Sequence, residues 1–200
     1  MILDVGVDLD ECVYPFVDVL RHWIHRDTRR PLDTLPPPAR WSLPEQWGYQ
    51  PDELHAIVAR GVAAGVIFRS GSPIPGALEA LRHLADAGHR IHVVTARHAI
   101  GADDVVEEST RWWVTEHGLP HTSLTFSSDK SVVPTDVFID DSPDNYAALE
   151  AAGTNPWFFD RPWNSGVQGR RVHTWEQFVS VVDRHSLRLD DFAGVGKNIH

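Results

Sequence analysis

The chain has 200 residues, of which 42% are hydrophobic and 23% are charged, and its formal net charge is −10. These values are ordinary for a soluble globular protein, and the length allows one large domain or one core with a sizeable insertion. The acidic balance argues against a broad interface with a nucleic-acid polymer, which would need a basic face.

The cysteine content and the lengths of the apolar runs indicate the cellular compartment in which the protein is expected. Cys12 is the only cysteine, so an intrachain disulfide is excluded and a reducing compartment is favoured. No apolar run reaches the length needed to cross a bilayer, and the first residues lack the pattern of a signal peptide. We therefore expect a cytoplasmic protein without a membrane partner.

The first predicted element is a short apolar strand that ends in two acids. The run from Ile2 to Val7 is too short for a helix and fits a parallel strand buried on both faces. Asp8 and Asp10 follow at its carboxyl end, where open α/β sheets place their ligands. Two carboxylates this close repel each other, and a hard cation such as Mg²⁺ would offset the repulsion. The alternative is a strand that simply ends in an Asp-rich turn.

Residues 15–70 are predicted to form a helical insertion, a cap, between the first and second strands. Apolar residues recur at helical spacing on both sides of a proline-rich segment, and the prolines exclude a long regular element there. The expected helices begin at Phe16, at Ser42 (which with Glu45 resembles a capping box) and at Pro51, the last running to about Val66.

After the insertion, strands and helices are predicted to alternate to about residue 185. Short apolar runs mark the strands, and amphipathic segments with capping residues mark the helices. The expected strands are 89–94, 124–126, 137–139 and 155–159, and the expected helices are 77–87, 103–117, one from Pro143 with Ser142 as its cap, and one capped by Thr174 and Gln177.

This alternation predicts an α/β fold with a doubly wound parallel sheet and right-handed crossovers. The predicted organisation is a core of residues 1–14 and 71–185, the helical cap of 15–70, and a loosely docked tail of 186–200.

Polar side chains follow four of the predicted strands or the turns after them. Taken as one site, carboxylates supply oxygen ligands for Mg²⁺, while a hydroxyl and a lysine bind phosphate. A carboxylate can attack phosphorus and a second acid can protonate the leaving oxygen, which is the chemistry of a phosphate monoesterase. The four clusters are Asp8 with Asp10, Thr95, Lys130, and Asp140 with Asp141.

Each of these residues also has a purely structural interpretation. Lys130 would in isolation be a surface lysine, and Thr95 a plain helix cap. Asp140 and Asp141 would in isolation place negative charge at the start of the next helix. The order of all four clusters along the chain favours the site.

Together the clusters resemble, in order, the four signature motifs of haloacid dehalogenase-like (HAD) phosphatases. Three further segments are similar to 5′(3′)-deoxyribonucleotidases of that superfamily, so the fold expected is a Rossmann-like HAD core. The resemblance covers about residues 3–15 and 66–180 and is weaker through the cap. The similar segments are Pro73 to Leu81, Asp129 to Asp144, and Arg171 to Trp175.

The resemblance implies a role for each matching residue. Asp8 would be the nucleophile and a metal ligand, and Asp10 the general acid/base with its backbone carbonyl on Mg²⁺. The substrate would be a deoxynucleoside monophosphate, and a homodimer is compatible with the assignment. The remaining roles are phosphate binding by Thr95, Ala96 and Lys130, metal binding by Asp140 and Asp141, and contact with the base or sugar by Phe16, Trp47 and Arg97, with Trp41 and Tyr49 as further stacking surface.

Two residues depart from the family pattern. Glu11 stands where the family commonly has Gly, directly after the acid/base, and adds charge and bulk beside the site. Arg97 follows Thr95 and Ala96 where deoxyribonucleotidases usually carry a different residue, and we expect it to contact phosphate or sugar.

Three hypotheses stand on the sequence alone. The first is a Mg²⁺-dependent deoxyribonucleotidase that works through an aspartyl-phosphate. The second keeps this reaction but acts on a sugar phosphate or another small phosphometabolite. The third, from another class, is a non-catalytic phosphoacceptor or ligand-binding module, against which the acid/base at Asp10 argues.

Overall fold

The strands form one parallel sheet. The computed structural model describes residues 1–40, 42–97 and 103–195. Its six strands are hydrogen-bonded in the order β3-β2-β1-β4-β5-β6, and every pairing is parallel. The strands are β1 (Asp4–Val7), β2 (Arg90–Thr95), β3 (Ser123–Phe126), β4 (Val137–Asp140), β5 (Asn155–Phe159) and β6 (Arg171–Val172).

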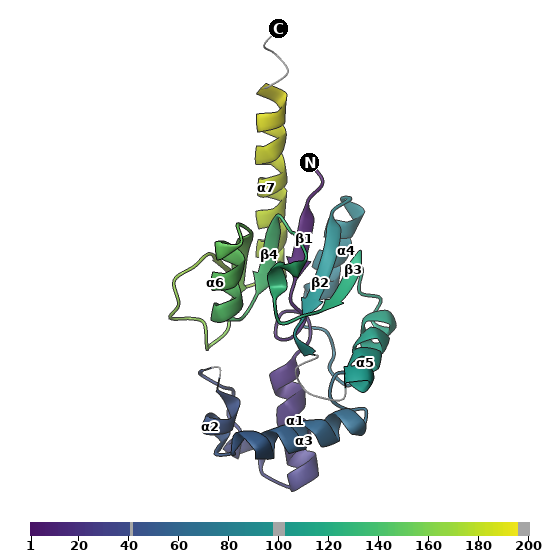
Figure 1. Ribbon diagram of the computed structural model, residues 1–200, viewed down its shortest axis with the longest axis vertical. Helices are drawn as coiled ribbons and strands as arrows, with labels where there is room; N and C mark the ends of the chain where they lie inside the picture. Colours follow the sequence, from purple (N-terminus) through teal and green to yellow (C-terminus); the bar gives the residue numbers. More distant parts are fainter. Residues whose placement is uncertain (41, 98–102, 196–200) are drawn as a thin grey trace.

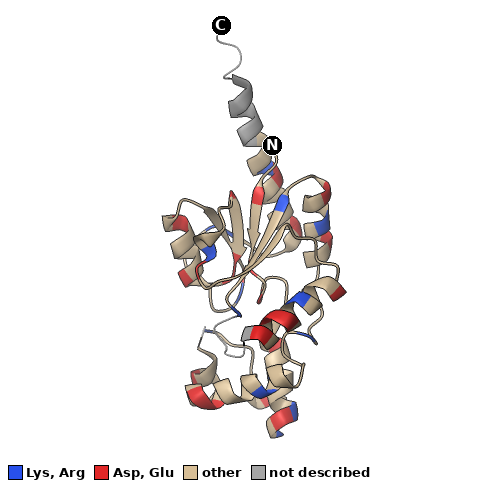
Figure 2. Ribbon diagram, turned by 45° about the vertical axis from the view of Figure 1, so that its right-hand side comes forward, with Lys and Arg blue, Asp and Glu red and all other residues tan. Residues whose placement is uncertain are grey.

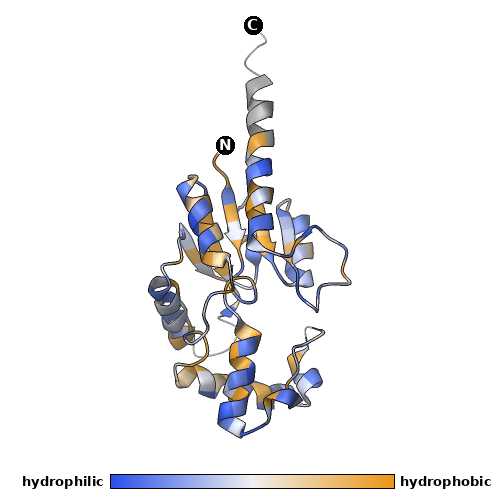
Figure 3. Ribbon diagram, turned by 180° about the vertical axis from the view of Figure 1, so that it is seen from behind, coloured by the Kyte–Doolittle hydropathy of each residue, from blue (hydrophilic) through white to orange (hydrophobic). Residues whose placement is uncertain are grey.

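Helices cover both faces of the sheet and fill the region beyond its carboxyl edge. α4 packs against α7 on one face, as seen from behind in Figure 3, and α6 packs against β4 and β5. Helices α1, α2 and α3 lie beyond the carboxyl ends of the strands, and α7 projects the opposite way (Figure 1). The helices are α1 (Phe16–Thr28), η1 (Leu32–Thr34), α2 (Leu43–Trp47), α3 (Pro51–Ala63), α4 (Ala77–Asp86), α5 (Asp103–Glu116), η3 (Lys130–Val132), α6 (Pro143–Ala151) and α7 (Trp175–Val195).

The strand order places a topological switch point at β1. The chain moves from β1 outward to β2 and β3, and then returns to the other side of β1 to form β4. Ligands of open α/β sheets bind at the carboxyl end of such a switch point. Acidic segments stand at this edge, between the sheet and helices α1 to α3, in Figure 2.

The central strands are buried on both faces, as their apolar sequences predict. Val5 and Val7 of β1 and Val137 and Ile139 of β4 are fully buried. Such strands read as nearly continuous apolar runs because helices cover both sides of a parallel sheet. Among the described residues, no helix combines the length and the apolar character that crossing a lipid bilayer requires.

The predicted fold class is confirmed, and the differences in detail have local causes. The expected capping box at Ser42 is wrong: the Ser42 side chain caps nothing, and the box forms at Gln50 and Glu53 before α3. The last helix continues past His185 to Val195, since no proline or glycine interrupts the sequence before Gly194. The two-residue strand β6 was not expected, because so short an edge strand has no periodicity to detect.

Gly6 in β1 gives a direct test of the central packing. A Cβ atom at Gly6 would lie 2.0 Å from Cδ2 of Phe138, its neighbour in β4, so the ring occupies the space of the missing side chain. Overpacking of this kind costs about 1–3 kcal/mol, and we expect Gly6→Ala to lower the free energy of unfolding by that amount. Chemical denaturation measures the change.

Gly166 supplies the matched control, because a Cβ there would meet nothing within 4 Å. Gly166→Ala should leave stability nearly unchanged. Adding Phe138→Leu to Gly6→Ala should recover part of the loss. Equal effects of the two alanine substitutions would contradict this account of the packing.

Asp4 provides a pH-dependent tie between β1 and β2. Arg90 donates to Asp4 from Nε at 2.6 Å and also from Nη2, and His92 Nε2 lies 2.8 Å from Asp4 Oδ1. The hydrogen bond from Arg90 lowers the pKa of Asp4 to about 2. A carboxyl whose pKa falls on folding stabilises above its unfolded pKa and loses that contribution as pH falls toward the folded value.

We therefore expect Asp4→Asn to be less stable than the parent chain near neutral pH. The difference should shrink below about pH 4 and vanish only below about pH 2. Urea unfolding across this range measures it, with Asp144→Asn at an exposed position of α6 as the control. A difference that stays constant with pH would rule out the ionic contribution.

Candidate active site

A tight loop after β1 presents Asp8 and Asp10. The Asp8 N–H donates to the Ile139 carbonyl at 2.9 Å, which continues the ladder between β1 and β4. The chain then turns back, because the N–H groups of Val13 and Tyr14 both donate to the Leu9 carbonyl. Asp8 is thereby left buried at the carboxyl edge of the sheet.

The turn explains why glycine suits the position after Asp10. Glu11 has a φ of 59°, in the left-handed region that favours glycine. Its carboxylate accepts a 2.7 Å hydrogen bond from the Val17 N–H in the first turn of α1. Arg161 donates to the Glu11 carbonyl at 2.9 Å, and its Nε lies 3.6 Å from Glu11 Oε2. Burial raises the pKa of Glu11 to about 7, although the Val17 bond and Arg161 lower it.

Lys130 reaches Asp8 from the turn after β3. Lys130 begins the short helix η3, and Asp129 caps the helix by accepting from the Ser131 N–H. The Lys130 ammonium donates to Asp8 Oδ1 at 2.5 Å and to the Val94 carbonyl at 2.7 Å. Burial opposes the charge on Lys130, but Asp8 and the neighbouring acids outweigh it and raise the pKa of Lys130.

The two acids after β4 have different surroundings. Asp140 is fully buried and accepts hydrogen bonds from Asn145 Nδ2 at 3.1 and 3.0 Å and from the Ser142 N–H at 2.8 Å. Asp141 accepts one bond, at 2.9 Å, from the indole N–H of Trp163. As expected, Ser142 caps α6 and Pro143 begins it.

Asp141 lies next to the nucleophile candidate. Oxygen atoms of Asp8 and Asp141 and the Cys12 sulfur all lie within 4.8 Å of one another. Burial raises the pKa of Asp8 to about 7, with Lys130 lowering it and Asp140 raising it. Burial likewise raises the pKa of Asp140 and of Asp141.

This donor set fits a divalent cation. Three buried carboxylates face one lysine, so the cluster as it stands favours protonation. Hard oxygen donors and an uncompensated negative charge are what a divalent ion such as Mg²⁺ requires. Within the set, the surroundings favour Asp141 over Asp140 as a ligand beside Asp8, because Asn145 and a backbone N–H already hold Asp140.

Thr95 carries an unpaired hydroxyl at the same edge. It ends β2, it is fully buried, and its Oγ1 has no hydrogen-bond partner among the described residues. An unsatisfied buried polar atom costs free energy and calls for an explanation, and a phosphate oxygen would supply the missing partner. Ala96, the next residue, is exposed.

Arg97 lies where the sequence did not lead us to expect it. Its side chain is fully buried and pairs with Asp10, from Nη2 to Oδ1 at 2.7 Å, and it also donates to Thr110 Oγ1 at 3.1 Å. We expected Arg97 to contact phosphate or sugar. In the structure its donors are directed to Asp10 and to α5.

The aromatic residues expected to contact the base have different surroundings. Trp47 is 1% exposed and donates its indole N–H to the Pro36 carbonyl, so it belongs to the core of the helical segment. Phe16 is partly buried and stacks on Phe68 with centroids 5.8 Å apart. The Tyr49 ring lies under the Arg30 guanidinium, and Trp41 falls outside the described residues.

Three site residues were missed from the sequence. They are Arg161, Trp163 and Asn164. The contacts of Arg161 and Trp163 are described above, and Asn164 donates to the carbonyls of Asp141 and Phe159. All three follow β5 at the carboxyl edge of the sheet. The rule that identified the other four clusters could therefore have found this fifth one, had the polar and aromatic residues after β5 been weighed.

Comparison with known proteins places the chain in a family. Residues 1–186 match the family described as 5′ nucleotidase, deoxy (pyrimidine), cytosolic type C protein. A protein of Chlorobaculum tepidum named "Putative 5'(3')-deoxyribonucleotidase" is 31% identical over 185 residues, which cover 89% of each chain.

Solved structures agree in fold. A "putative phosphoglycolate phosphatase" from Lactobacillus delbrueckii subsp. bulgaricus has a TM-score of 0.64 at 12% identity, over 90% of this chain and 97% of that one. A haloacid dehalogenase-like family hydrolase from Streptococcus pneumoniae has a TM-score of 0.61 at 10% identity, over 90% of this chain and 98% of that one. The chain therefore has the fold of HAD-like proteins, belongs to the 5′ nucleotidase, deoxy (pyrimidine), cytosolic type C family, and is a phosphate monoester hydrolase of the 5′-nucleotidase type.

Proposed function

We propose that this hydrolase is a Mg²⁺-dependent 5′(3′)-deoxyribonucleotidase that cleaves deoxynucleoside monophosphates through an aspartyl-phosphate. The observation that carries the proposal is the arrangement around Asp8. A buried carboxylate is bonded to Lys130, lies close to Asp141, and shares its sheet edge with the unpaired hydroxyl of Thr95. Groups suited to act as nucleophile, cation, metal ligand and hydrogen-bond donor to a phosphate are thus gathered at one switch point.

The chain's own residues then account for each proton and bond. A carboxylate oxygen of Asp8 attacks phosphorus, and the bond from phosphorus to the sugar oxygen breaks. Asp10, as its carboxylic acid, gives its proton to that leaving oxygen. Asp10, now a carboxylate, takes a proton from the water that attacks the aspartyl-phosphate, and the bond between phosphorus and Asp8 breaks to release inorganic phosphate.

Binding groups hold the phosphoryl oxygens during both steps. Lys130 and the Thr95 hydroxyl would contact the phosphate, with the backbone at Ala96 as a further donor. Mg²⁺ bound by Asp8, the Asp10 carbonyl and Asp141, with Asp140 behind them, would neutralise charge on the transferring phosphoryl group.

We further propose that residues 15–70 act as a cap over the core of residues 1–14 and 71–185. Helices α1 to α3 lie beyond the carboxyl edge that carries the site (Figure 1). A cap in this place can exclude water during the attack by Asp8 and must reopen for release of the product.

Support for a nucleoside substrate comes from the relatives and from one cavity. The Chlorobaculum tepidum relative carries the name of a deoxyribonucleotidase. A cavity of about 230 Å³ lies between the proline-rich segment of the cap and the loop after β5, and is lined by Glu11, Arg21, Pro37, Pro38, Arg161 and Trp163. It adjoins the site, because Glu11 follows Asp10 and Trp163 bonds to Asp141.

The reaction and the substrate class can be tested together. We expect phosphate release from deoxynucleoside monophosphates to need Mg²⁺, to stop in EDTA, and to fall at least about 1,000-fold in Asp8→Asn, which cannot form the phosphoenzyme. The panel should include ribonucleotides and sugar phosphates. Asp136→Asn, outside the site, is the control for loss of one acid. Release from sugar phosphates alone would keep the mechanism and reject the nucleotidase.

Phe16 and Trp47 should separate substrate contact from structure. If the Phe16 ring stacks on the base, Phe16→Ala removes about 1–3 kcal/mol of binding and raises KM with little change in kcat. Phe16→Tyr keeps the ring and should keep KM. Trp47→Ala should instead lower the melting temperature, because Trp47 is buried within the cap. An equal fall of kcat in Phe16→Ala and Asp8→Asn would refute this division.

A further inference from the structure

Arg97 makes an unusually complete set of contacts for a residue beside an active-site acid. Its Nε lies 3.2 and 3.0 Å from the two carboxylate oxygens of Asp10, and its Nη2 donates to Oδ1 at 2.7 Å. The remaining nitrogen, Nη1, donates to Thr110 Oγ1 of α5 at 3.1 Å. The Arg97 side chain has no exposed surface, whereas Asp10 is 23% exposed. Part of the Asp10 carboxylate is thus held by Arg97, while part of it stays accessible.

Two aromatic rings enclose the guanidinium. Its carbon lies 4.5 Å from the centroid of Tyr14 and 4.3 Å from that of Phe68. Tyr14 comes from the loop that carries Asp10, and Phe68 from the segment in which the chain returns from α3 to the core. The two ring centroids lie 6.3 Å apart with the ring planes tilted by 50°, so the rings pack against two adjoining sides of the guanidinium. Contact of a planar cation with aromatic rings is favoured electrostatically.

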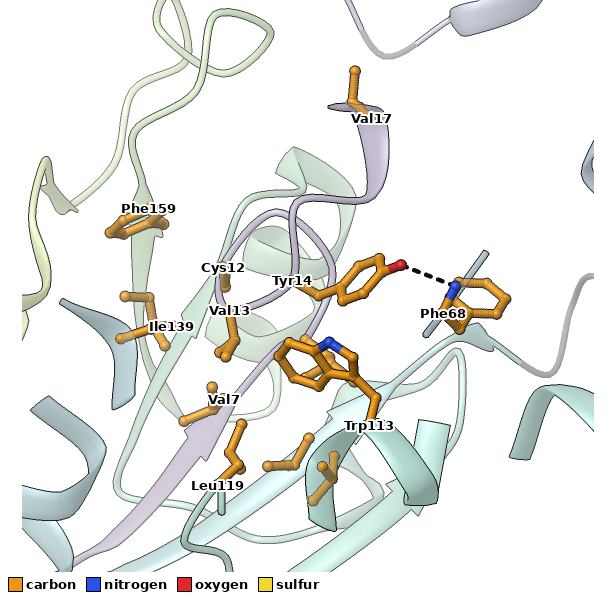
Figure 4. Packing of buried hydrophobic residues seen from close by; sticks show 14 of the residues in the cluster. Val7, Cys12, Val13, Tyr14, Val17, Phe68, Trp113, Leu119, Ile139 and Phe159 are labelled. Carbon is orange, nitrogen blue, oxygen red and sulfur yellow. Dashed lines mark hydrogen bonds between the residues drawn. The ribbon is translucent and has the colours of Figure 1, made fainter. Parts of the chain in front are cut away.

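The enclosing rings are themselves fixed. The Phe68 N–H donates to the Tyr14 hydroxyl at 2.9 Å, and Tyr14 meets Trp113 edge-on at 5.1 Å (Figure 4). Trp113, from α5, donates its indole N–H to the Gly71 carbonyl at 2.6 Å. The loop after β1, the return segment and α5 therefore all set the position of Arg97.

A stability role alone does not account for this arrangement. Buried ion pairs often contribute little net stability, because desolvation of the two charges offsets their attraction. What the forked guanidinium supplies is geometry: two donor nitrogens in one plane set both the distance and the orientation of a carboxylate. Lysine offers a point charge and cannot do this.

We propose that Arg97 is a positioning residue that holds the Asp10 carboxyl group against the leaving-group oxygen. The inference rests on the proposed function, in which Asp10 gives its proton to that oxygen as the bond from phosphorus to oxygen breaks. Arg97 touches neither the substrate nor the phosphoryl group in this role. Its contribution to the rate of hydrolysis should be seen only with substrates whose leaving oxygen needs a proton in order to depart.

Leaving-group chemistry separates this role from a structural one. The sugar oxygen of a deoxynucleotide would leave as a strongly basic alkoxide and needs the proton, whereas 4-nitrophenyl phosphate releases a stable phenolate that does not. The ratio kcat/KM covers all steps up to departure of the leaving group. General acid catalysis contributes about 10²–10⁴-fold, so we expect Arg97→Met to lower kcat/KM at least about 100-fold for a deoxynucleoside monophosphate and less than about tenfold for 4-nitrophenyl phosphate.

Four further variants sharpen the test. Arg97→Lys should show an intermediate loss with the same preference for the aryl substrate. Asp10→Asn should show that preference too, and adding Arg97→Met to it should cost little more, because both act on one proton transfer. Arg69→Met is the matched control: Arg69 also lies over an aromatic ring, Trp112, and donates to α5 at Ser109, but it does not contact Asp10. It should show no dependence on the leaving group.

Several results would overturn the inference. Equal losses on both substrates in Arg97→Met would make Arg97 structural, and a raised KM at unchanged kcat would make it a substrate contact. If Arg97→Met does not fold by circular dichroism, Arg97→Lys decides, since equal losses on both substrates in that variant would also make Arg97 structural. If the parent chain hydrolyses neither substrate, or if Asp10→Asn shows no leaving-group preference, the proposed function itself fails. A failure confined to the Arg97 variants overturns the positioning role alone.

Discussion

The site depends on one costly contact, the buried pair of Asp8 and Lys130. Both side chains are nearly inaccessible to water, and burial alone would drive each toward its neutral form. They are held together at 2.5 Å because β1 delivers Asp8 and the turn after β3 delivers Lys130 to the same end of the sheet. The parallel strand order is what makes this meeting possible, since every strand ends at that edge.

The surroundings of the other two acids, Asp140 and Asp141, can be understood from this pair. Asp140 is held by Asn145 and by the start of α6, and so it adds negative charge behind the site without being free to move. Asp141 keeps a carboxylate beside Asp8. The excess of carboxylates over lysines works against a folded chain on its own, and it favours a divalent cation together with a phosphorylated ligand. The carboxylates that lower the stability of the chain on its own are thus the groups suited to bind these ligands.

The sequence predicted the parallel sheet and most of the residues now gathered in the candidate site, because these follow from short-range signals. A strand that ends in two acids, or in an acid pair before a Ser-Pro cap, is visible in consecutive residues such as Asp140 to Pro143. The partners of those residues were less accessible. The burial of Trp47 and the contact of Arg97 with Asp10 depend on how segments distant in sequence pack, and no periodicity in the sequence records such packing.

Backbone strain points to the same part of the molecule as the side chains do. Among the described residues, three that are not glycine have positive φ, and two of them border the Asp10 loop: Glu11 at 59° and Phe68 at 71°. Such residues cost about 1–3 kcal/mol each and persist only where their surroundings impose them. The backbone conformation of Glu11 is held by its hydrogen bond to the first turn of α1 and by Arg161. That of Phe68 is held by the hydrogen bond from its N–H to the Tyr14 hydroxyl.

These two residues also stand on either side of the segment that contains α1 to α3. Glu11 stands where the chain leaves the core for α1, and its carboxylate sits at the N-terminus of that helix, a favourable place for negative charge. Phe68 stands where the chain returns, with its ring on Arg97. A glycine at position 11 would satisfy the turn more easily but would sever the contact with α1. Glu11 therefore ties α1 to the loop that carries both proposed catalytic acids.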